Sequence, residues 1–166
     1  ARPRAGSRRL RVLVVNAFFD DWRANTRSPH KVPQAMAPFH AAGIFNRALC
    51  DVRVYSEHHS GPLLDRALYA WPDVLVLSGL NVAFDRMLHV CAYARSCRPG
   101  VLVIAGGHAV RALPQRAAQF FDYACTGDVE ELAGIIAAEF GRDCVADTFT
   151  PRYDLIAHNR WLGYAE

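Results

Sequence analysis

Several signals are missing from this chain of 166 residues. No apolar run approaches the roughly 20 residues that a membrane-spanning helix needs. The five cysteines show no C-x-x-C spacing, and no three of them lie close enough in sequence to suggest an iron–sulfur cluster loop. The arginine-rich start has no apolar core of the kind found in secretory signals. These absences predict a cytoplasmic protein with reduced thiols and no membrane partner.

Basic charge is concentrated at one end of the chain. The net charge is +3, but five of the 19 basic residues are arginines within residues 1–11. Without them the chain has 14 basic residues against 16 acidic ones. We therefore expect a basic, disordered tail over residues 1–9 and no nucleic-acid partner.

Length and composition fit one globular domain. Hydrophobic residues make up 52% of the chain and charged residues 21%, which suffices for a single sizeable core. We place this domain at residues 10–146. Residues 147–166 are expected to form an extension or linker.

Continuous apolar runs recur along the chain and alternate with helical patterns. A strand that is apolar on both faces needs helices on both sides, which is typical of a parallel α/β sheet. Strands are expected at residues 12–16, 51–55, 73–78, 101–105 and 122–125. Only the second alternates, which favours an edge position. The sequence thus predicts a flavodoxin-like (Rossmann-like) fold, a five-stranded parallel sheet of order 2-1-3-4-5 with helices on both faces.

Helical patterns separate these strands. Helices are expected at residues 32–46, 62–70, after Gly79, at 113–120 and at 129–140. Asp128 and Glu131 have the spacing of a capping box, and Gly141 suits a helix stop. Residues 17–31 are expected to form a long loop and residues 56–61 a polar, solvated loop.

In this strand order, ligands bind at the carboxyl ends of the strands. The residues that leave the first, third, fourth and fifth strands are then expected to share one rim and to contact the ligand. Paired glycines after the fourth strand would let a bulky group approach the main chain, although a tight turn alone would explain them equally well. The predicted ligand-contacting residues are Asn16, Ala17, Phe18, Ser78, Gly79, Leu80, Asn81, Gly106, Gly107, His108, Thr126, Gly127 and Asp128.

Common occupants of such a rim lack their motifs here. A phosphoreceiver domain needs an aspartate after the third strand and a lysine near the fifth, where this chain has Ser78 and Thr126. A flavin mononucleotide site needs a Ser/Thr/Gly loop after the first strand, and a dinucleotide site needs G-x-G-x-x-G there. The first strand is instead followed by Ala17-Phe-Phe-Asp-Asp21. A large, flat, mostly apolar ligand remains.

An ordered set of motifs resembles the amino-terminal, cobalamin-binding domain of cobalamin-dependent radical SAM enzymes. That family includes the anaerobic magnesium-protoporphyrin cyclases and many methyltransferases. The similar segments, which span about residues 10 to 156, are Val12-Leu-Val-Val-Asn16, Pro72-Asp-Val-Leu-Val-Leu-Ser-Gly-Leu80, Val103-Ile-Ala-Gly-Gly-His108 with Pro114, Asp122-Tyr123, Thr126-Gly-Asp-Val-Glu130 and Pro151-Arg-Tyr-Asp154.

The resemblance implies that cobalamin lies across the carboxyl rim with its nucleotide tail threaded into the sheet. Residues 78–80 would flank the tail, Gly106 and Gly107 would admit it, and residues 126–128 would close its far side. Residues 16–19 would face the corrin. The cofactor itself carries the methyl or radical chemistry.

Two departures from the family limit this expectation. The D-x-H-x-x-G motif that supplies a lower histidine ligand in methionine synthase is absent after the first strand, and His58 matches it by spacing only, after the wrong strand. The C-x-x-x-C-x-x-C motif is also absent. A 4Fe-4S cluster and S-adenosylmethionine would therefore belong to a separate radical SAM barrel, acting in cis or in trans, and the chain alone is not expected to catalyse a reaction.

The same residues fit other interpretations. A stand-alone cobalamin carrier or sensor, or a vestigial module of the same fold, would show the same strand motifs. Glu57, His58 and His59 could belong to a metal site with His30 or His40, but adjacent histidines are more typical of a solvated loop. His108 could contact the nucleotide tail or cap the next helix. No nucleophile is paired with a base, so hydrolysis is not expected.

Overall fold

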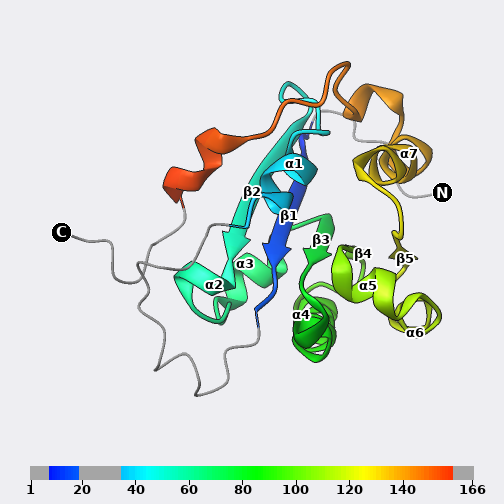
Figure 1. Cartoon of the computed structure of the whole chain (residues 1–166). Helices are drawn as coiled ribbons and strands as arrows, with labels where there is room; N and C mark the ends of the chain where they lie inside the picture. The colour runs from blue at the N-terminus through cyan, green and yellow to red at the C-terminus, as the bar shows by residue number, and fades with distance from the viewer. Residues whose placement is uncertain (1–7, 19–34, 159–166) are drawn as a thin grey trace.

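The computed structural model describes residues 8–18 and 35–158. Their centre is a five-stranded, all-parallel sheet of order β2-β1-β3-β4-β5 (Figure 1). This confirms the predicted fold class, the strand order and the edge position of the second strand. The strands are β1 (Leu10–Asn16), β2 (Cys50–Ser56), β3 (Val74–Ser78), β4 (Leu102–Gly106) and β5 (Tyr123–Ala124).

Helical segments connect the strands. They are α1 (Ala37–Ala42), α2 (Glu57–Ser60), α3 (Arg66–Ala70), the 3-10 segment η3 (Asn81–Ala83), α4 (Phe84–Cys97), α5 (His108–Ala112), α6 (Pro114–Phe120), α7 (Val129–Phe140), and two further 3-10 segments, η4 (Arg142–Cys144) and η5 (Tyr153–His158). Among these helices, none is both long and apolar enough to cross a bilayer.

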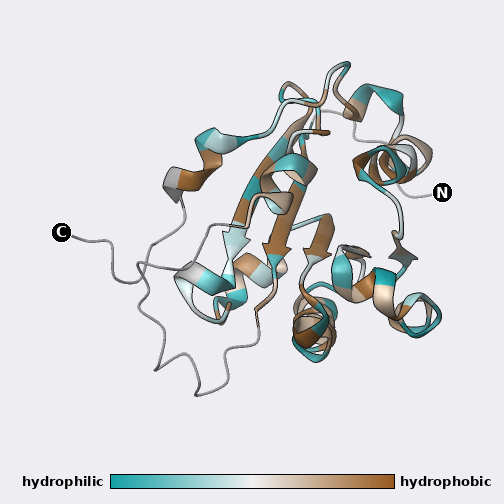
Figure 2. Ribbon diagram, in the orientation of Figure 1, coloured by the Kyte–Doolittle hydropathy of each residue, from teal (hydrophilic) through white to brown (hydrophobic). Residues whose placement is uncertain are grey.

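Alternate residues of each central strand enter two separate cores, as period-2 side chains must. Val12 and Val14 belong to one core with residues of α1, α7, η4 and η5, whereas Leu13 and Val15 belong to the other with residues of α3, α4, α5 and α6. The central strands are apolar along their length (Figure 2). Burial on both faces explains why β1, β3 and β4 have continuous apolar sequences, while β2 alternates at the edge.

Helix ends depart most from the sequence predictions. The helix expected at residues 32–46 is described only over Ala37–Ala42, and residues 32–34 lie outside the described part. The helix expected from residue 62 starts at Arg66, because the Asp65 side chain accepts hydrogen bonds from Ala67 N and Leu68 N as its N-cap. A further helix, α5, precedes the predicted one at Pro114. The bounds of α7 match the prediction, and it ends at Gly141 with φ 102°.

Arg8, Arg9 and Arg11 belong to the folded body at the amino end of the sheet. Arg8 Nη2 lies 2.7 Å from Asp73 Oδ1, and Arg11 and Arg98 also pair with this carboxylate. Arg9 donates to the carbonyl oxygen of Cys50. Two residues of the expected tail, Arg8 and Arg9, thus contact the domain, whereas residues 1–7 lie outside the described part.

Candidate ligand site at the carboxyl edge of the sheet

The strand register brings three predicted positions, Asn16, Ser78 and Gly106, to one level. Asn16 pairs with Ser56 on one side and Ser78 on the other, and Ser78 pairs with Gly106. The Ser78 hydroxyl lies 3.3 Å from Asn16 Oδ1, and Ala17 N donates to Ser78 O at 2.8 Å. The ends of β1, β3 and β4 therefore form one continuous polar edge, as expected from the topology.

The two paired glycines have different roles. Gly107 has φ 86° and ψ −169°, a conformation open almost only to glycine. A Cβ at Gly107 would also lie 3.3 Å from Gly79 O and 3.4 Å from Gly79 N. Gly107 is thus a turn residue packed against the backbone of Gly79. Gly106 has no positive φ, and a Cβ there would meet only Cys125 at an ordinary 3.5 Å.

A cavity of about 540 Å³ opens beside this edge, between α1 and α7. We call it the rim cavity. It reaches the face of the sheet at Val76 and Ile104. Its lining residues are Ala37, His40, Ala41, Val76, Leu77, Ser78, Ile104, Gly106, Gly107, His108, Arg111, Cys125, Gly127, Asp128, Val129, Glu130 and Leu132.

The rim cavity separates the predicted site residues into two groups. Six of them line it: Ser78, Gly106, Gly107, His108, Gly127 and Asp128. The others, Asn16, Ala17, Phe18, Gly79, Leu80, Asn81 and Thr126, lie outside its lining. Leu80 is 60% exposed beside the end of β3, so it presents an apolar side chain at the edge of the sheet. Phe19 lies outside the described residues.

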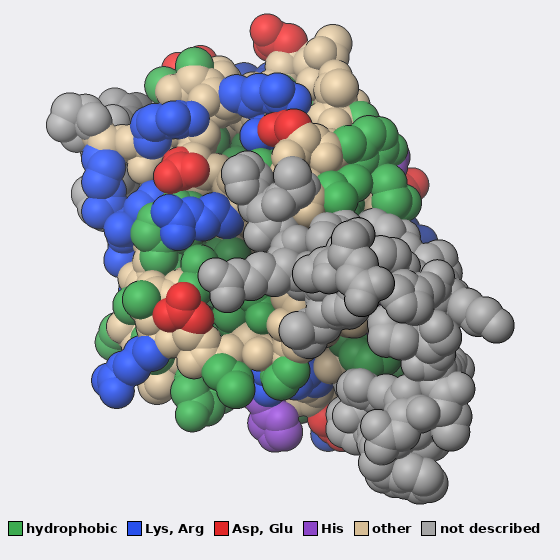
Figure 3. All heavy atoms as spheres, turned by 90° about the vertical axis from the view of Figure 1, so that its left-hand side faces the viewer, with side chains coloured by type: hydrophobic (Ala, Val, Ile, Leu, Met, Phe, Trp, Pro, Cys, Tyr) green, Lys and Arg blue, Asp and Glu red, His purple; other side chains and the backbone are tan. Residues whose placement is uncertain are grey.

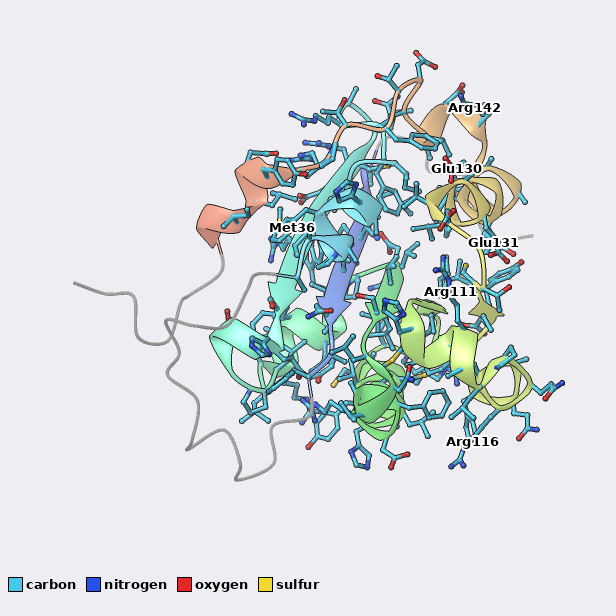
Figure 4. The ribbon with its side chains drawn as sticks, viewed as in Figure 1. Met36, Arg111, Arg116, Glu130, Glu131 and Arg142 are labelled. Atoms are coloured by element: carbon cyan, nitrogen blue, oxygen red, sulfur yellow. The ribbon has the colours of Figure 1, made fainter. Side chains whose placement is uncertain are left out.

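Arg111 holds the turn between β5 and α7. Its Nε donates to Thr126 O at 2.9 Å, and its Nη2 donates to Gly127 O and to Asp128 Oδ1 at 2.8 and 2.7 Å. Figure 4 shows Arg111 between α5 and the start of α7. Sequence reasoning missed Arg111 because its partners lie 15 to 17 residues away and no local motif marks it.

The predicted capping box is present only in altered form. Asp128 precedes α7 in an extended conformation, but its side chain makes no cap hydrogen bond. Glu131 Oε2 instead accepts from Gly127 N at 2.6 Å, one residue before the expected donor. The reason is Arg111, which pairs with the Asp128 carboxylate. The turn is therefore fixed from both α5 and α7, and it forms a defined wall of the rim cavity.

The prediction of a solvated loop over residues 56–61 is wrong. Residues 57–60 form the helix α2, and Glu57 is only 3% exposed. Its carboxylate accepts from Phe18 N at 3.2 Å and from Leu63 N at 2.8 Å. Arg86 Nη2 lies 2.6 Å from Glu57 Oε1, and hydrogen bonding to Glu57 raises the pKa of the Arg86 guanidinium. A buried pair thus ties the end of β1 to α2 and α4.

His58 lies closer to the rim than the sequence suggests. Its ring meets Phe18 edge-on, with ring centroids 4.0 Å apart. This contact follows from the parallel pairing of β1 with β2, which places the residues after both strands side by side. Within the described part of the chain, no group of three or more His, Cys, Asp and Glu side chains could hold a metal ion.

A second cavity of about 490 Å³ follows the β2 edge. Its lining includes Arg9, Arg47, Arg53 and Arg152. Figure 3 shows basic side chains gathered on this face of the molecule. Several of these arginines are already engaged: Arg53 lies over Trp71 at 4.1 Å, and Arg152 pairs with Asp154. This cavity lies along the strand and not at the carboxyl ends, so it is the weaker candidate for a cofactor.

Comparison with models of protein families, with curated proteins and with solved structures gives no match. The fold and the geometry of the carboxyl edge therefore carry the functional argument.

Proposed function

We propose that this domain binds cobalamin at the carboxyl edge of the sheet, as the cofactor-binding part of a radical SAM enzyme of the methyltransferase or cyclase type. The rim cavity is the observation that carries the proposal. Its volume of about 540 Å³ lies within the range of roughly 300 to 1,000 Å³ typical of small-molecule sites. It also opens where a parallel α/β sheet binds its ligands.

The shape of the site suits a ligand with a flat body and a narrow tail. The tail would enter between α1 and α7 and lie on the sheet at Val76 and Ile104, which line the rim cavity. Gly106 would leave room beside β4, because it has no side chain there. The corrin would lie outside, over the ends of β1 and β3, where the exposed Leu80 offers an apolar contact.

The residues of this chain bind and orient the ligand in this proposal. Arg111 fixes the turn at residues 126–128, so the far wall of the rim cavity is formed before the ligand arrives. Cobalamin supplies the methyl-transfer or radical chemistry when bound. Reduction of S-adenosylmethionine would require a cluster held by a barrel domain.

The test is binding of hydroxocobalamin to the purified domain, followed by dialysis and measurement of the corrin absorbance that stays with the protein. We expect close to one molecule of cobalamin per molecule of protein after dialysis. Gly106→Val should abolish this binding, because its side chain would occupy the space beside β4. The domain should stay folded, because a Cβ at Gly106 meets only Cys125, at an ordinary 3.5 Å. Gly100→Val is the matched control, since nothing lies within 4 Å of a Cβ at Gly100. Dialysed protein without corrin absorbance would refute the proposal.

A further inference from the structure

The lining of the rim cavity is divided by depth. Its floor consists of Val76, Ile104, Cys125 and Leu132, each at most 6% exposed. Burial raises the pKa of the Cys125 thiol to about 12, so this side chain is neutral. The charged lining residues and the two histidines are all exposed at the mouth: His40, His108, Arg111, Asp128 and Glu130.

The backbone of the floor has little hydrogen-bonding capacity to offer. Val76 pairs with Ile104 in the β3–β4 ladder, and Ile104 pairs with Tyr123 in the β4–β5 ladder. Cys125 N donates to Ala105 O at 2.7 Å. A group that reaches the floor therefore meets apolar side chains and one thiol, with the neighbouring strand amides engaged by the sheet.

Two kinds of nucleotide base differ in the free energy of burial on such a floor. The dimethylbenzimidazole of cobalamin has two methyl groups and no exocyclic polar group, so its burial removes apolar surface from water. Adenine, the base of some other cobamides, has an exocyclic amine and additional ring nitrogens. These would lose their hydrogen bonds to water without replacement, which is costly for each buried group.

From this floor, and resting on the proposed function, we infer that the domain is selective for the lower base of its cofactor. The rim cavity accepts cobamides with an apolar benzimidazole base and discriminates against those with a purine base. Selection of this kind works by leaving polar groups of the wrong ligand unpaired. The residues at the mouth contribute little to this selectivity, because their charged groups stay in water whichever base is bound.

The experiment compares three corrinoids by equilibrium dialysis: cobalamin, the cobamide with adenine as its lower base, and cobinamide, which lacks the nucleotide tail. We expect the adenine cobamide to bind at least about tenfold more weakly than cobalamin, since one unpaired buried polar group suffices for that factor. Cobinamide should bind more weakly than cobalamin as well, because it leaves the rim cavity empty.

A pair of variants tests whether the floor is the source of the selectivity. Val76→Thr adds a hydroxyl to the floor, and the preference for cobalamin over the adenine cobamide should fall several-fold. Val14→Thr is the matched control: Val14 is buried on the same face of the sheet, in the neighbouring strand, but does not line the rim cavity. The Val14→Thr variant should prefer cobalamin over the adenine cobamide as strongly as the parent does.

The outcomes separate the two proposals. Equal binding of cobalamin and the adenine cobamide overturns the inferred selectivity but leaves the proposed function standing. Equal binding of cobalamin and cobinamide shows that the tail does not enter the rim cavity, and this too overturns the inference alone. Failure of all three corrinoids to bind overturns the proposed function, and the selectivity falls with it.

Discussion

Removing the charge of Glu57 should destabilise the domain more than any change to an exposed ion pair. The Glu57 side chain is 1% exposed and that of Arg86 is 20% exposed, so the pair is largely shielded from water. Loss of one partner of a buried pair costs about 3–5 kcal/mol. Arg86 keeps some access to water, so we expect Glu57→Gln to lose about 3 kcal/mol, near the lower limit of that range.

The backbone contacts of Glu57 support this magnitude. Its carboxylate also accepts from Phe18 N and Leu63 N, and a glutamine has only one oxygen to serve these donors and Arg86. For a domain of this size, 3 kcal/mol corresponds to a fall of about 6–12 °C in Tm. Urea denaturation followed by circular dichroism gives the free energy, and a thermal melt gives Tm.

A control and a cycle complete the design. Asp147→Asn breaks the pair between Arg142 and Asp147, whose side chains are 62% and 102% exposed at 3.9 Å, and should change stability by less than about 1 kcal/mol. A double-mutant cycle of Glu57→Gln and Arg86→Met should give an interaction energy of about 1–3 kcal/mol between the two side chains. A loss below about 1 kcal/mol for Glu57→Gln would refute the reasoning that the pair is held away from water.

Two further predictions concern the backbone and the thiols. Gly107→Ala should lower the free energy of unfolding by about 1–3 kcal/mol in the absence of any ligand, because its positive φ strains an alanine. Gly106→Ala should lower the free energy of unfolding much less. Equal losses of stability in the two variants would contradict the roles assigned to the two glycines. The raised pKa of Cys125, about 12 against 9.0, means that folding favours the protonated thiol, so its contribution to stability is complete below pH 9 and declines as pH rises from 9 towards 12. The free energy of unfolding, measured by denaturation at pH 7.5 and 10.5, should show this decline. In Cys125→Ala the difference between the two pH values should be smaller by about 2 kcal/mol. If the variant has the same pH dependence as the parent, the thiol is not buried.

The sheet could be predicted because its signals are local. Continuous apolar runs mark buried parallel strands, and the single alternating run at β2 fixed the edge and with it the strand order. The helix α7 was predicted over its full length because its amphipathic pattern ends at Gly141, a residue suited to the positive φ found there.

The environment of Glu57 could not be predicted, because it depends on distant residues. A Glu-His-His-Ser sequence is polar, and nothing within it shows that Arg86, 29 residues further on, reaches the carboxylate. The walls of the rim cavity were missed for the same reason. His40 and Leu132 come from helices on opposite sides of it, and only the packing of α1 and α7 on one face of the sheet brings them together.

The position of β1 has a consequence for how the chain acquires its structure. β1 pairs with both β2 and β3, yet it precedes both in the chain. During synthesis its apolar residues are therefore complete well before Val74–Ser78 exist to cover their second edge. Such pairing between distant segments slows folding, and it leaves an apolar strand with an unpaired edge until β3 has been synthesised. A nascent chain that stops before β3 thus presents one edge of β1, the centre of the future sheet, without its partner strand, and an unpaired edge is open to pairing with another chain.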